Sequence, residues 1–388
     1  MFMFSRFRQA CRYHFYCTIQ SSYSTFPSIS RDRSRSLLSR LKVERNPERI
    51  LEILRSSTLT PVAHIDRICF SVAITKLTDR KHFNGIREFI EELKTTRIDL
   101  RNEDFMCHAI IWYGQAKMLD DAIRSFEQMD ELGIPRSVKS LNALLIACSV
   151  CENYKEECRI FLEFPKVYGI EPNLDTYNAA VKAFCIMGSS SSAFSLLAEM
   201  DKNFVKPDAT TFGNLLTGFY IEEKLEDVGK VLKVMEQYGI KPGIDTYNIR
   251  IQSLCKLKRS EEAKALVDGM MSRGVKPNST SYCNLIHGFC KEGNYEAAKN
   301  LLVDMRTKAI RPSANCYFVL ASFLIEGGDF VSAFLVSQKS IENGWVPPYS
   351  LMTKLVKGLV SISKVDDARN IVKTIKQKFK NDDLTLII

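Results

Sequence analysis

The sequence predicts an all-α solenoid, a right-handed superhelix of about nine to ten helix-turn-helix repeats of 35 residues. The prediction rests on a proline that recurs every 35 residues, an aromatic residue at the same interval, and alanine and methionine in phase with both. A self-similar period of this length is typical of a stacked array. The positions are Pro207, Pro242, Pro277, Pro312 and Pro347; Tyr177, Phe212, Tyr247, Tyr282 and Tyr317; Met200, Met235, Met270 and Met305; and Ala193, Ala263, Ala298, Ala333 and Ala368, with Val228 at the intervening step.

Each repeat is predicted to contain two helices, as residues 244–278 illustrate. The first helix runs over about 246–256. After the polar turn "KLKRS", the second places apolar residues at i, i+3, i+4 and i+7, from Ala263 to Met270. Gly274 is expected to end it in a left-handed conformation. Because one hairpin cannot bury its own apolar stripe, neighbouring hairpins must stack on it.

The chain is divided accordingly into a leader at 1–30, diverged helical repeats at 31–102, an array at 103–383 and a tail at 384–388. Terminal repeats often diverge because one of their sides faces solvent. The units of the array are 103–137, 138–173, 174–208, 209–243, 244–278, 279–313, 314–348 and 349–383.

The leader has the composition of an organellar transit peptide. It contains Arg6, Arg8 and Arg12, many Ser and aromatic residues, and neither Asp nor Glu. Its Arg residues alternate with bulky apolar residues, which favours the mitochondrial matrix over the chloroplast. The alternative is an uncleaved basic arm. Since the sequence lacks the roughly 18 consecutive apolar residues of a membrane span, we expect no membrane insertion.

The repeats resemble the pentatricopeptide repeat. The similarity lies in Tyr177-Asn178, in "TYN" at 246–248, and in the endings "KPD" at 206–208 and "KPN" at 276–278. The competing tetratricopeptide repeat lacks this proline-containing ending. The segments 40–61, 138–148, 247–256 and 343–350 further resemble the short, plain-repeat (P-class) members associated with plant mitochondrial ribosomes.

The resemblance implies that the concave groove binds single-stranded RNA, with the fifth and last residues of each unit selecting one base. On this basis Asn178 with Asp208 resembles a uracil reader, and two further pairs resemble pyrimidine readers: Asn142 with Asn173, and Asn248 with Asn278. Lys256 and Lys291 are expected to contact phosphate. As an alternative, an Asn at the fifth position caps or turns its helix.

Other units depart from the family pattern. Four pairs have no clear base assignment: Cys107 with Ser137, Gly213 with Gly243, Cys283 with Ser313, and Phe318 with Pro348. The position that usually holds a small apolar residue against the base carries Lys139, Asp175, Thr210, Asp245, Thr280 and Asn315.

Three readable positions cannot single out one transcript, so the hypothesis is a non-catalytic scaffold of the mitochondrial ribosome's small subunit that supports translation. Its partners would be single-stranded or ribosomal RNA and mitochondrial ribosomal proteins. One alternative is a free RNA-binding factor that stabilises, processes or activates an organellar transcript. The other is a protein-interaction solenoid that binds no RNA.

No enzyme activity, cofactor or small-molecule substrate is expected. The sequence has no P-loop, no dinucleotide-binding glycine pattern and no His-x-Glu of a zinc deaminase. Cys148, Cys151 and Cys158 allow a metal site or buried thiols, and the recurrence of Cys185, Cys255 and Cys290 in one column favours buried thiols. The acidic residues Glu222, Glu223 and Glu226 are interpreted as a solvated helix face.

Overall fold

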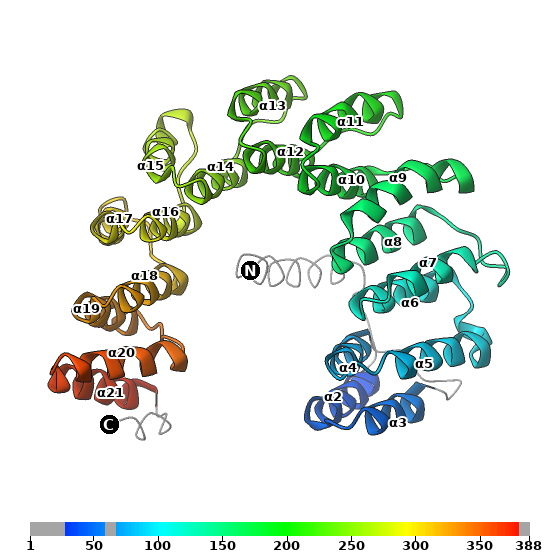
Figure 1. Ribbon diagram of the computed structural model, residues 1–388, viewed down its shortest axis with the longest axis horizontal. Helices are drawn as coiled ribbons and strands as arrows, with labels where there is room; N and C mark the ends of the chain where they lie inside the picture. Colours follow the sequence, from blue (N-terminus) through cyan, green and yellow to red (C-terminus); the bar gives the residue numbers. More distant parts are fainter. Residues whose placement is uncertain (1–27, 59–66, 380–388) are drawn as a thin grey trace. The chain divides into compact units, whose positions relative to one another are not determined.

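The computed structural model describes residues 28–58 and 67–379, and the regular structure of these residues is entirely helical (Figure 1). They form twenty α-helices and two short 3-10 helices. Within each of two compact units, consecutive helices pair into hairpins that stack on one another, which confirms the predicted all-α solenoid. The expected leader lies outside the described residues except for its last three, and the expected tail lies wholly outside them.

The chain divides into two compact units, of which the first extends to Pro172. Its hairpins are α2–α3, α4–α5, α6–α7 and α8–α9, and α4, α6 and α8 pack on one another in order. The helix bounds are α2 Ser28–Val43, α3 Pro47–Thr58, α4 Arg67–Asp79, α5 Phe83–Thr96, α6 Glu103–Gln115, α7 Leu119–Glu127, α8 Val138–Cys151 and α9 Tyr154–Tyr168, with the 3-10 helix η1 at Ile98–Leu100.

The second unit begins at Asn173 and contains six hairpins. Its first helices start every 35 residues: α10 Leu174–Ile186, α12 Ala209–Ile221, α14 Ile244–Lys256, α16 Ser279–Lys291, α18 Ala314–Glu326 and α20 Tyr349–Ser361. The second helices are α11 Ser190–Lys202, α13 Leu225–Gln237, α15 Ser260–Asp268, α17 Tyr295–Thr307, α19 Phe330–Glu342 and α21 Val365–Phe379, with the 3-10 helix η2 at Met271–Arg273.

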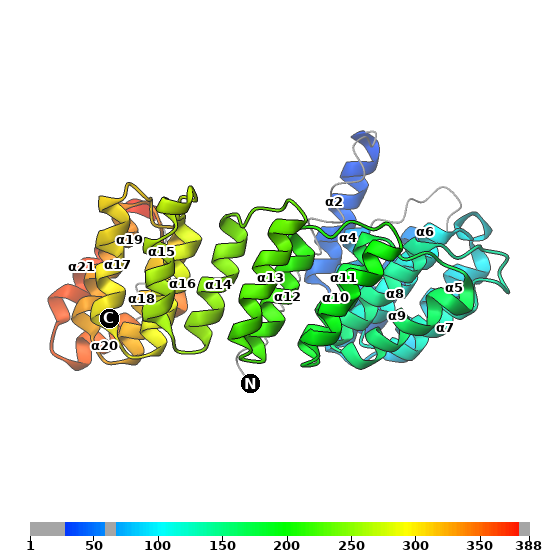
Figure 2. The same ribbon diagram turned by 90° about the horizontal axis from the view of Figure 1, so that it is seen from above.

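Within the second unit, the first helices form one row and the second helices cover its outer side (Figures 1 and 2). Each first helix packs on the next first helix and on the second helix of its own hairpin. The ends of consecutive first helices are therefore brought together all along this unit. We call the contact between two consecutive first helices a junction.

The residues of the repeating columns form the core. The aromatic column is buried, with Tyr177 and Tyr282 fully enclosed, and the repeated Ala and Met residues are buried beside it. Burying one such large side chain contributes about 1.5–3 kcal/mol. The enclosed hydroxyls have acceptors, since Tyr177 donates to Glu199 at 3.2 Å and Tyr282 donates to Asp304 at 2.8 Å. The column thus joins the two helices of a hairpin.

The hairpin of residues 244–278 shows how the second helices end. The α-helix α15 ends at Asp268, two residues before the predicted Met270, and continues as the 3-10 helix η2. Gly274 then adopts a φ of 74°, the predicted left-handed conformation. The Val275 N–H donates to the Met270 carbonyl at 3.1 Å, so the last turn is closed.

Candidate functional site

The last residue of a unit begins the first helix of the next unit. Asn173, Asp208 and Asn278 are the N-cap residues of α10, α12 and α16. The Asp208 carboxylate, for example, accepts from the Thr211 N–H at 2.8 Å. In return, the Thr211 hydroxyl accepts from the Asp208 N–H at 3.1 Å, which completes a capping box. Each of these three expected base-reading side chains is therefore fixed by a helix terminus.

The fifth residue of the same unit contacts this cap. Asn178 on α10 donates from Nδ2 to Asp208 Oδ1 at 3.2 Å, and its Oδ1 accepts from the Thr211 hydroxyl at 2.6 Å. Asn214 on α12 donates to the Asn178 carbonyl at 3.2 Å. The two expected readers thus form one hydrogen-bonded cluster at the α10–α12 junction, which we call the Asn178 junction.

The same cluster recurs at the α14–α16 junction, which we call the Asn248 junction. Asn248 donates from Nδ2 to Asn278 Oδ1 at 3.5 Å and accepts from the Ser281 hydroxyl at 2.7 Å. Asn284 donates to the Asn248 carbonyl at 3.4 Å. The capping alternative is therefore wrong for Asn178 and Asn248, because the caps are the last residues of the units and not the fifth.

Sequence reasoning missed the residues that hold these pairs in place, chiefly Thr211 and Ser281. A usable signal was present, because a Ser or Thr three residues after an Asp or Asn N-cap has the spacing of a capping box. Asn214 and Asn284 carried no such local signal. They act on backbone carbonyls in the preceding first helix, 36 residues earlier in the chain.

Both junctions keep hydrogen-bonding capacity. The contacts of the Asn178 side chain use one of its two amide N–H groups and one of its two oxygen lone pairs. Burial alone would raise the pKa of Asp208, but hydrogen bonds from Thr211 and Asn178 hold it below the ordinary value. Asp208 is therefore a carboxylate at neutral pH and only accepts hydrogen bonds. Asn178 and Asp208 are half-buried and remain within reach of a ligand.

The two residues of the third expected pair belong to different units. Asn142 lies half-buried on α8 in the first unit, whereas Asn173 caps α10 in the second. The α12–α14 junction carries Gly213 and Gly243 at the equivalent positions. A Cβ atom added to Gly213 would lie 3.0 Å from the Ile249 side chain, so this junction is tightly filled by an apolar group.

Lys256 and Lys291 lie away from the Asn pairs. They are the last residues of α14 and α16, whereas the pairs lie near the helix starts. Asn248 and Lys256 are separated by about 12 Å along the helix at about 1.5 Å per residue. Both lysines have much of their surface exposed. Burial of part of the Lys256 side chain lowers its pKa, and the nearby positive charge of Lys291 lowers it further. They form a cationic site separate from the amide clusters.

A carboxylate joins successive hairpins at the same two junctions. Glu222, which follows α12, accepts from the N–H of Ser190 at 2.6 Å, and Glu292 accepts from the N–H of Ser260 at 3.1 Å. The interpretation of Glu222 as part of a solvated face is therefore wrong, because its side chain is nine-tenths buried at a helix start. We call these contacts the Glu222 and Glu292 clamps.

Glycine allows close helix approach beside each clamp. A Cβ on Gly218 would lie 2.5 Å from Cys185, and one on Gly288 would lie 2.7 Å from the Cys255 Cβ. The α12–α14 junction between them has Ser253 and Leu257 at the positions of this Gly and Glu. The Glu292 clamp thus repeats the Glu222 clamp after 70 residues, or two repeats, whereas 70 residues further on Phe330 and Ile362 occupy the positions of its Ser and Glu.

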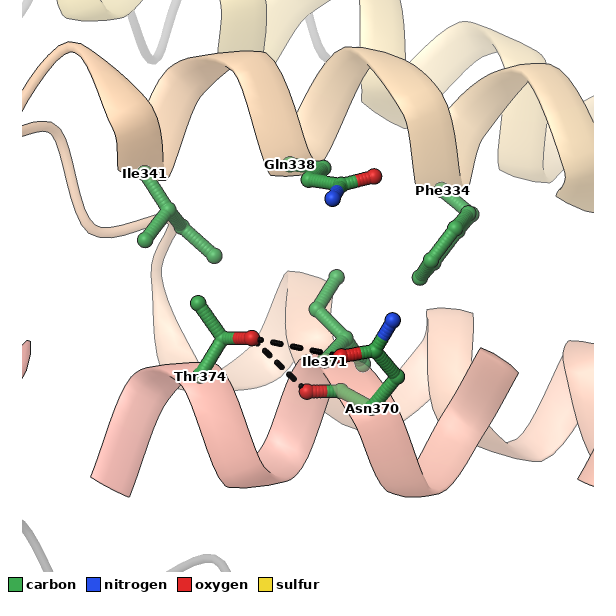
Figure 3. A pocket seen from close by; sticks show the side chains of 6 residues that line it. All are labelled: Phe334, Gln338, Ile341, Asn370, Ile371 and Thr374. Carbon is green, nitrogen blue, oxygen red and sulfur yellow. Dashed lines mark hydrogen bonds between the residues drawn. The ribbon is translucent and has the colours of Figure 1, made fainter. Parts of the chain in front are cut away.

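Two hollows lie between second helices. Phe334, Gln338 and Ile341 of α19 face Asn370, Ile371 and Thr374 of α21 across a space too narrow for water (Figure 3). The other hollow, of about 530 Å³, opens between α13 and α15 at the α12–α14 junction. Its lining is largely apolar, with Arg250, Arg259 and Glu262 among its polar residues.

The recurrent cysteines pack in the core. Cys185, Cys255 and Cys290 are buried, as the column predicted. Cys148 is buried as well, and Cys151 donates to the Gly114 carbonyl at 3.4 Å. Burial raises the pKa of Cys158 to about 11, which disfavours the thiolate that a metal would need. Among the described residues, no cluster of His, Cys, Asp and Glu has an arrangement that could hold a metal ion.

Within the part of the chain that the structure describes, no helix combines the length and apolar character needed to cross a bilayer.

Comparison with known proteins fits this architecture. Family models match as pentatricopeptide repeat domain at 124–186 and 195–256, as PPR repeat family at 242–291, and as PPR repeat at 108–134, 175–203 and 280–310. A mitochondrial pentatricopeptide repeat-containing protein of Arabidopsis thaliana is 52% identical over 94% of this chain and 91% of its own length. The chain belongs to the pentatricopeptide repeat family.

Other members of the family resemble only part of the chain. The Arabidopsis thaliana small ribosomal subunit proteins mL103 (rPPR7) and mS78 (rPPR3a) are each 32% identical. Their alignments cover 46% and 43% of this chain, and 43% and 42% of their own lengths. The chain thus matches less than half the length of these ribosomal relatives.

A solved structure with the same type of repeats is that of the maize pentatricopeptide repeat protein PPR10. It is 16% identical, with a TM-score of 0.43 over 89% of this chain and 58% of that chain. PPR10 in complex with an 18-nt psaJ RNA element gives 18% identity and a TM-score of 0.40 over 94% of this chain and 57% of that chain.

Proposed function

We propose that the protein is a non-catalytic mitochondrial scaffold that binds a short single-stranded RNA segment and joins the small subunit of the mitochondrial ribosome, where it supports translation. The observation that carries the RNA-binding proposal is the repeated cluster at the Asn178 and Asn248 junctions. In both, an amide on one first helix is oriented against the cap of the next. Such pairs offer donors and acceptors of fixed direction to the edge of an unstacked base.

The chemistry assigns different tasks to the two ends of the first helices. At the helix starts, Asn178 with Asp208 and Asn248 with Asn278 would contact base edges, and Asn142 with Asn173 would act likewise. At the helix ends, Lys256 and Lys291 would neutralise phosphates and carry no sequence information. Because the junction between the two clusters has Gly213 and Gly243, adjacent bases would not all be read.

The ribosomal part of the proposal rests on the resemblance to mL103 and mS78, which are named as small ribosomal subunit proteins. A small number of base contacts suits a fixed ribosomal RNA, for which shape and charge contribute much of the recognition. Ribosomal proteins would then bind the outer row of helices.

Sedimentation tests this assignment. Gently lysed mitochondria are separated on a density gradient before and after a high-salt wash, and the protein is followed against a known small-subunit protein. Co-migration that survives the wash is expected. Migration as a light species under both conditions would contradict ribosome association while leaving RNA binding open to direct measurement.

A free RNA-binding factor for one organellar transcript is the second candidate. The ribosomal relatives match less than half of this chain, which leaves room for a different role. Sequencing of RNA crosslinked to the protein separates the two. Ribosomal RNA from the small subunit supports the scaffold, and enrichment of one messenger RNA supports the free factor.

We also propose the organisation and location that the sequence analysis predicts. Residues 1–30 would direct import to the mitochondrial matrix and be removed, 31–102 would form diverged repeats, and 103–383 would be the repeat array. The mitochondrial names of several relatives support this location. Amino-terminal sequencing of the protein purified from mitochondria should find a new end near residue 30. An intact Met1 would contradict the leader.

A further inference from the structure

At the α16–α18 junction, thiols occupy the positions of the amide cluster. Cys283 is the fifth residue of its unit and so corresponds to Asn178 and Asn248. Cys316 is the third residue of α18 and corresponds to Thr211 and Ser281. In the other two junctions, the third residue donates a hydrogen bond to the side chain of the fifth. The fold therefore places the two sulfur atoms side by side, and we call this the Cys283 junction.

The contacts around the sulfurs bear out this placement. The Cys283 side chain lies within hydrogen-bonding reach of Cys316. The Cys316 thiol also faces the Ser279 carbonyl, to which it donates at 3.7 Å. Asn315 Nδ2 donates to Cys283 Sγ at 2.9 Å. The hydroxyl groups of Ser279 and Ser313 lie 3.4 Å and 3.5 Å from Cys316 Sγ. Both cysteines are reduced in the structure.

This environment favours a thiolate at Cys316. The residue lies in the first turn of α18, where the helix carries partial positive charge. The hydrogen bond from Cys283 outweighs the effect of burial and, with those from Ser279 and Ser313, lowers the pKa of Cys316 to about 6. By contrast, burial raises the pKa of Cys290 to about 12 and that of Cys255 to about 11. The pair thus differs in reactivity from the core cysteines around it.

We propose that Cys283 and Cys316 are a reversible oxidation site, at which a peroxide converts the two thiols into a disulfide linking α16 to α18. The proposal rests on the contacts within the Cys283 junction and does not depend on RNA binding. A disulfide here would fix two consecutive repeats to each other at the level of the base-reading residues.

The reaction balances with hydrogen peroxide as the oxidant. Cys283 has 7% of its surface exposed, whereas Cys316 is fully buried, so Cys283 is the sulfur that peroxide reaches. The Cys316 thiolate acts as the base: it takes the proton of the Cys283 thiol, and the Cys283 thiolate that results attacks the peroxide. This forms a sulfenic acid and releases hydroxide, which takes a proton from solvent to become water. Cys316 sulfur then attacks Cys283 sulfur, and the sulfenic oxygen leaves as water with the Cys316 proton. The two sulfurs supply the two electrons that reduce the peroxide.

Peptide mapping by mass spectrometry tests the proposal on the full-length protein. The protein is treated with hydrogen peroxide, its remaining thiols are alkylated, and it is digested without reductant. We expect a linked pair of peptides containing Cys283 and Cys316, two hydrogens lighter than their sum and separated by dithiothreitol. This link should be about tenfold more abundant than a link between core cysteines such as Cys185, Cys255 and Cys290, since burial raises the pKa of those thiols.

Two variants make the test specific. Cys316→Ser should abolish the link, and it should fold, because serine already occupies the same position at the Asn248 junction as Ser281. Cys290→Ser, in the last turn of α16, should leave the link intact. The proposal is overturned if wild-type protein gives no Cys283–Cys316 link, or if other cysteine pairs link equally well. Since the mapping contains no RNA, a failure here would leave the proposed function untouched, and the reverse also holds.

Discussion

Asn178 donates a hydrogen bond to Asp208 at 3.2 Å, so the two residues expected to select one base already contact each other across the α10–α12 junction. Thr211 bonds to both of them. The geometry that an RNA base would meet is therefore set before binding, and less ordering is needed when the base arrives.

The substitution Asn178→Ala should weaken binding of a short pyrimidine-containing RNA by about tenfold, since it removes one amide worth about 1.4 kcal/mol of binding free energy. Fluorescence anisotropy with a labelled oligonucleotide measures the change. Asn300→Ala, on the outer helix α17 and exposed, is the matched control and should bind as the wild type does. If the wild type and both variants bound the RNA with equal affinity, Asn178 would not be part of the RNA site.

Replacing Lys256 and Lys291 by Gln should lower RNA affinity at low salt and flatten its salt dependence. Each phosphate contact to single-stranded RNA contributes about 0.7 to the slope of log K against log salt, so the double variant should lose about 1.4. Titrations at several salt concentrations give the slope. Lys264→Gln, an exposed position on α15, should leave it unchanged. A slope that the double variant does not alter would exclude phosphate contacts at these lysines.

Substitution of Glu222 by Ala should destabilise the fold by about 1–3 kcal/mol, because the N–H of the fully buried Ser190 loses its acceptor. Urea unfolding followed by circular dichroism measures the free energy of unfolding, and hydrogen exchange at the Ser190 amide reports the lost bond directly. Glu226→Ala is the control, since this neighbouring residue is exposed, and it should change stability by less than about 0.5 kcal/mol. Similar losses in both variants would contradict the clamp.

Asp208 should make the stability of the protein sensitive to acid. Its pKa in the folded state lies below the ordinary 3.8, since hydrogen bonds from Thr211 and Asn178 outweigh the effect of burial. The unfolded chain therefore binds the proton more readily, so this stabilisation is complete above the ordinary value and is lost as the pH falls through the lowered one. Asp208→Asn keeps a capping side chain without the titration. Urea unfolding between about pH 5 and about pH 3 should give a shallower fall for this variant, and an unchanged fall would contradict the assignment.

Alanine substitution at two glycines should have opposite effects. In Gly218→Ala the new Cβ would lie 2.5 Å from Cys185 and from Ser190, so crowding should cost about 1–3 kcal/mol. In Gly229→Ala on α13 the new Cβ has nothing within 4 Å, and the gain in helix propensity should stabilise the protein by about 0.5–1 kcal/mol. Thermal unfolding of both variants checks the signs. A stabilising Gly218→Ala would mean that the junction can widen without loss.

The sequence predicts the fold well because helix periodicity and turn residues are local information. The repeated aromatic, Ala and Met columns identify the core, and the structure buries them. The second helix of residues 244–278 ends as an α-helix at Asp268 because Gly269, a weak helix former, follows it. The end of this helix depends on a single residue, so the local sequence is enough to predict it.

The candidate site was predicted only in part, since its chemistry depends on contacts between units. Thr211 reaches Asn178 over 33 residues, and Glu222 reaches Ser190 over 32. Nothing adjacent to Glu222 in the sequence distinguishes a buried acceptor from a solvated carboxylate. Pairing the thiols of Cys283 and Cys316 likewise requires the stacking of α16 on α18.

The two clamped junctions and the unclamped one between them set the smallest piece of chain that can be copied or removed there without mismatch. Cys185, Ser190, Gly218 and Glu222 match Cys255, Ser260, Gly288 and Glu292 at twice the repeat length. Excising one hairpin would place Leu225 or Leu257 where a carboxylate and a buried serine should meet. Excising two hairpins would again bring a carboxylate against a buried serine. Across residues 174–313, the building block for lengthening or shortening the array is therefore a double hairpin, even though the visible period of the sequence is a single one.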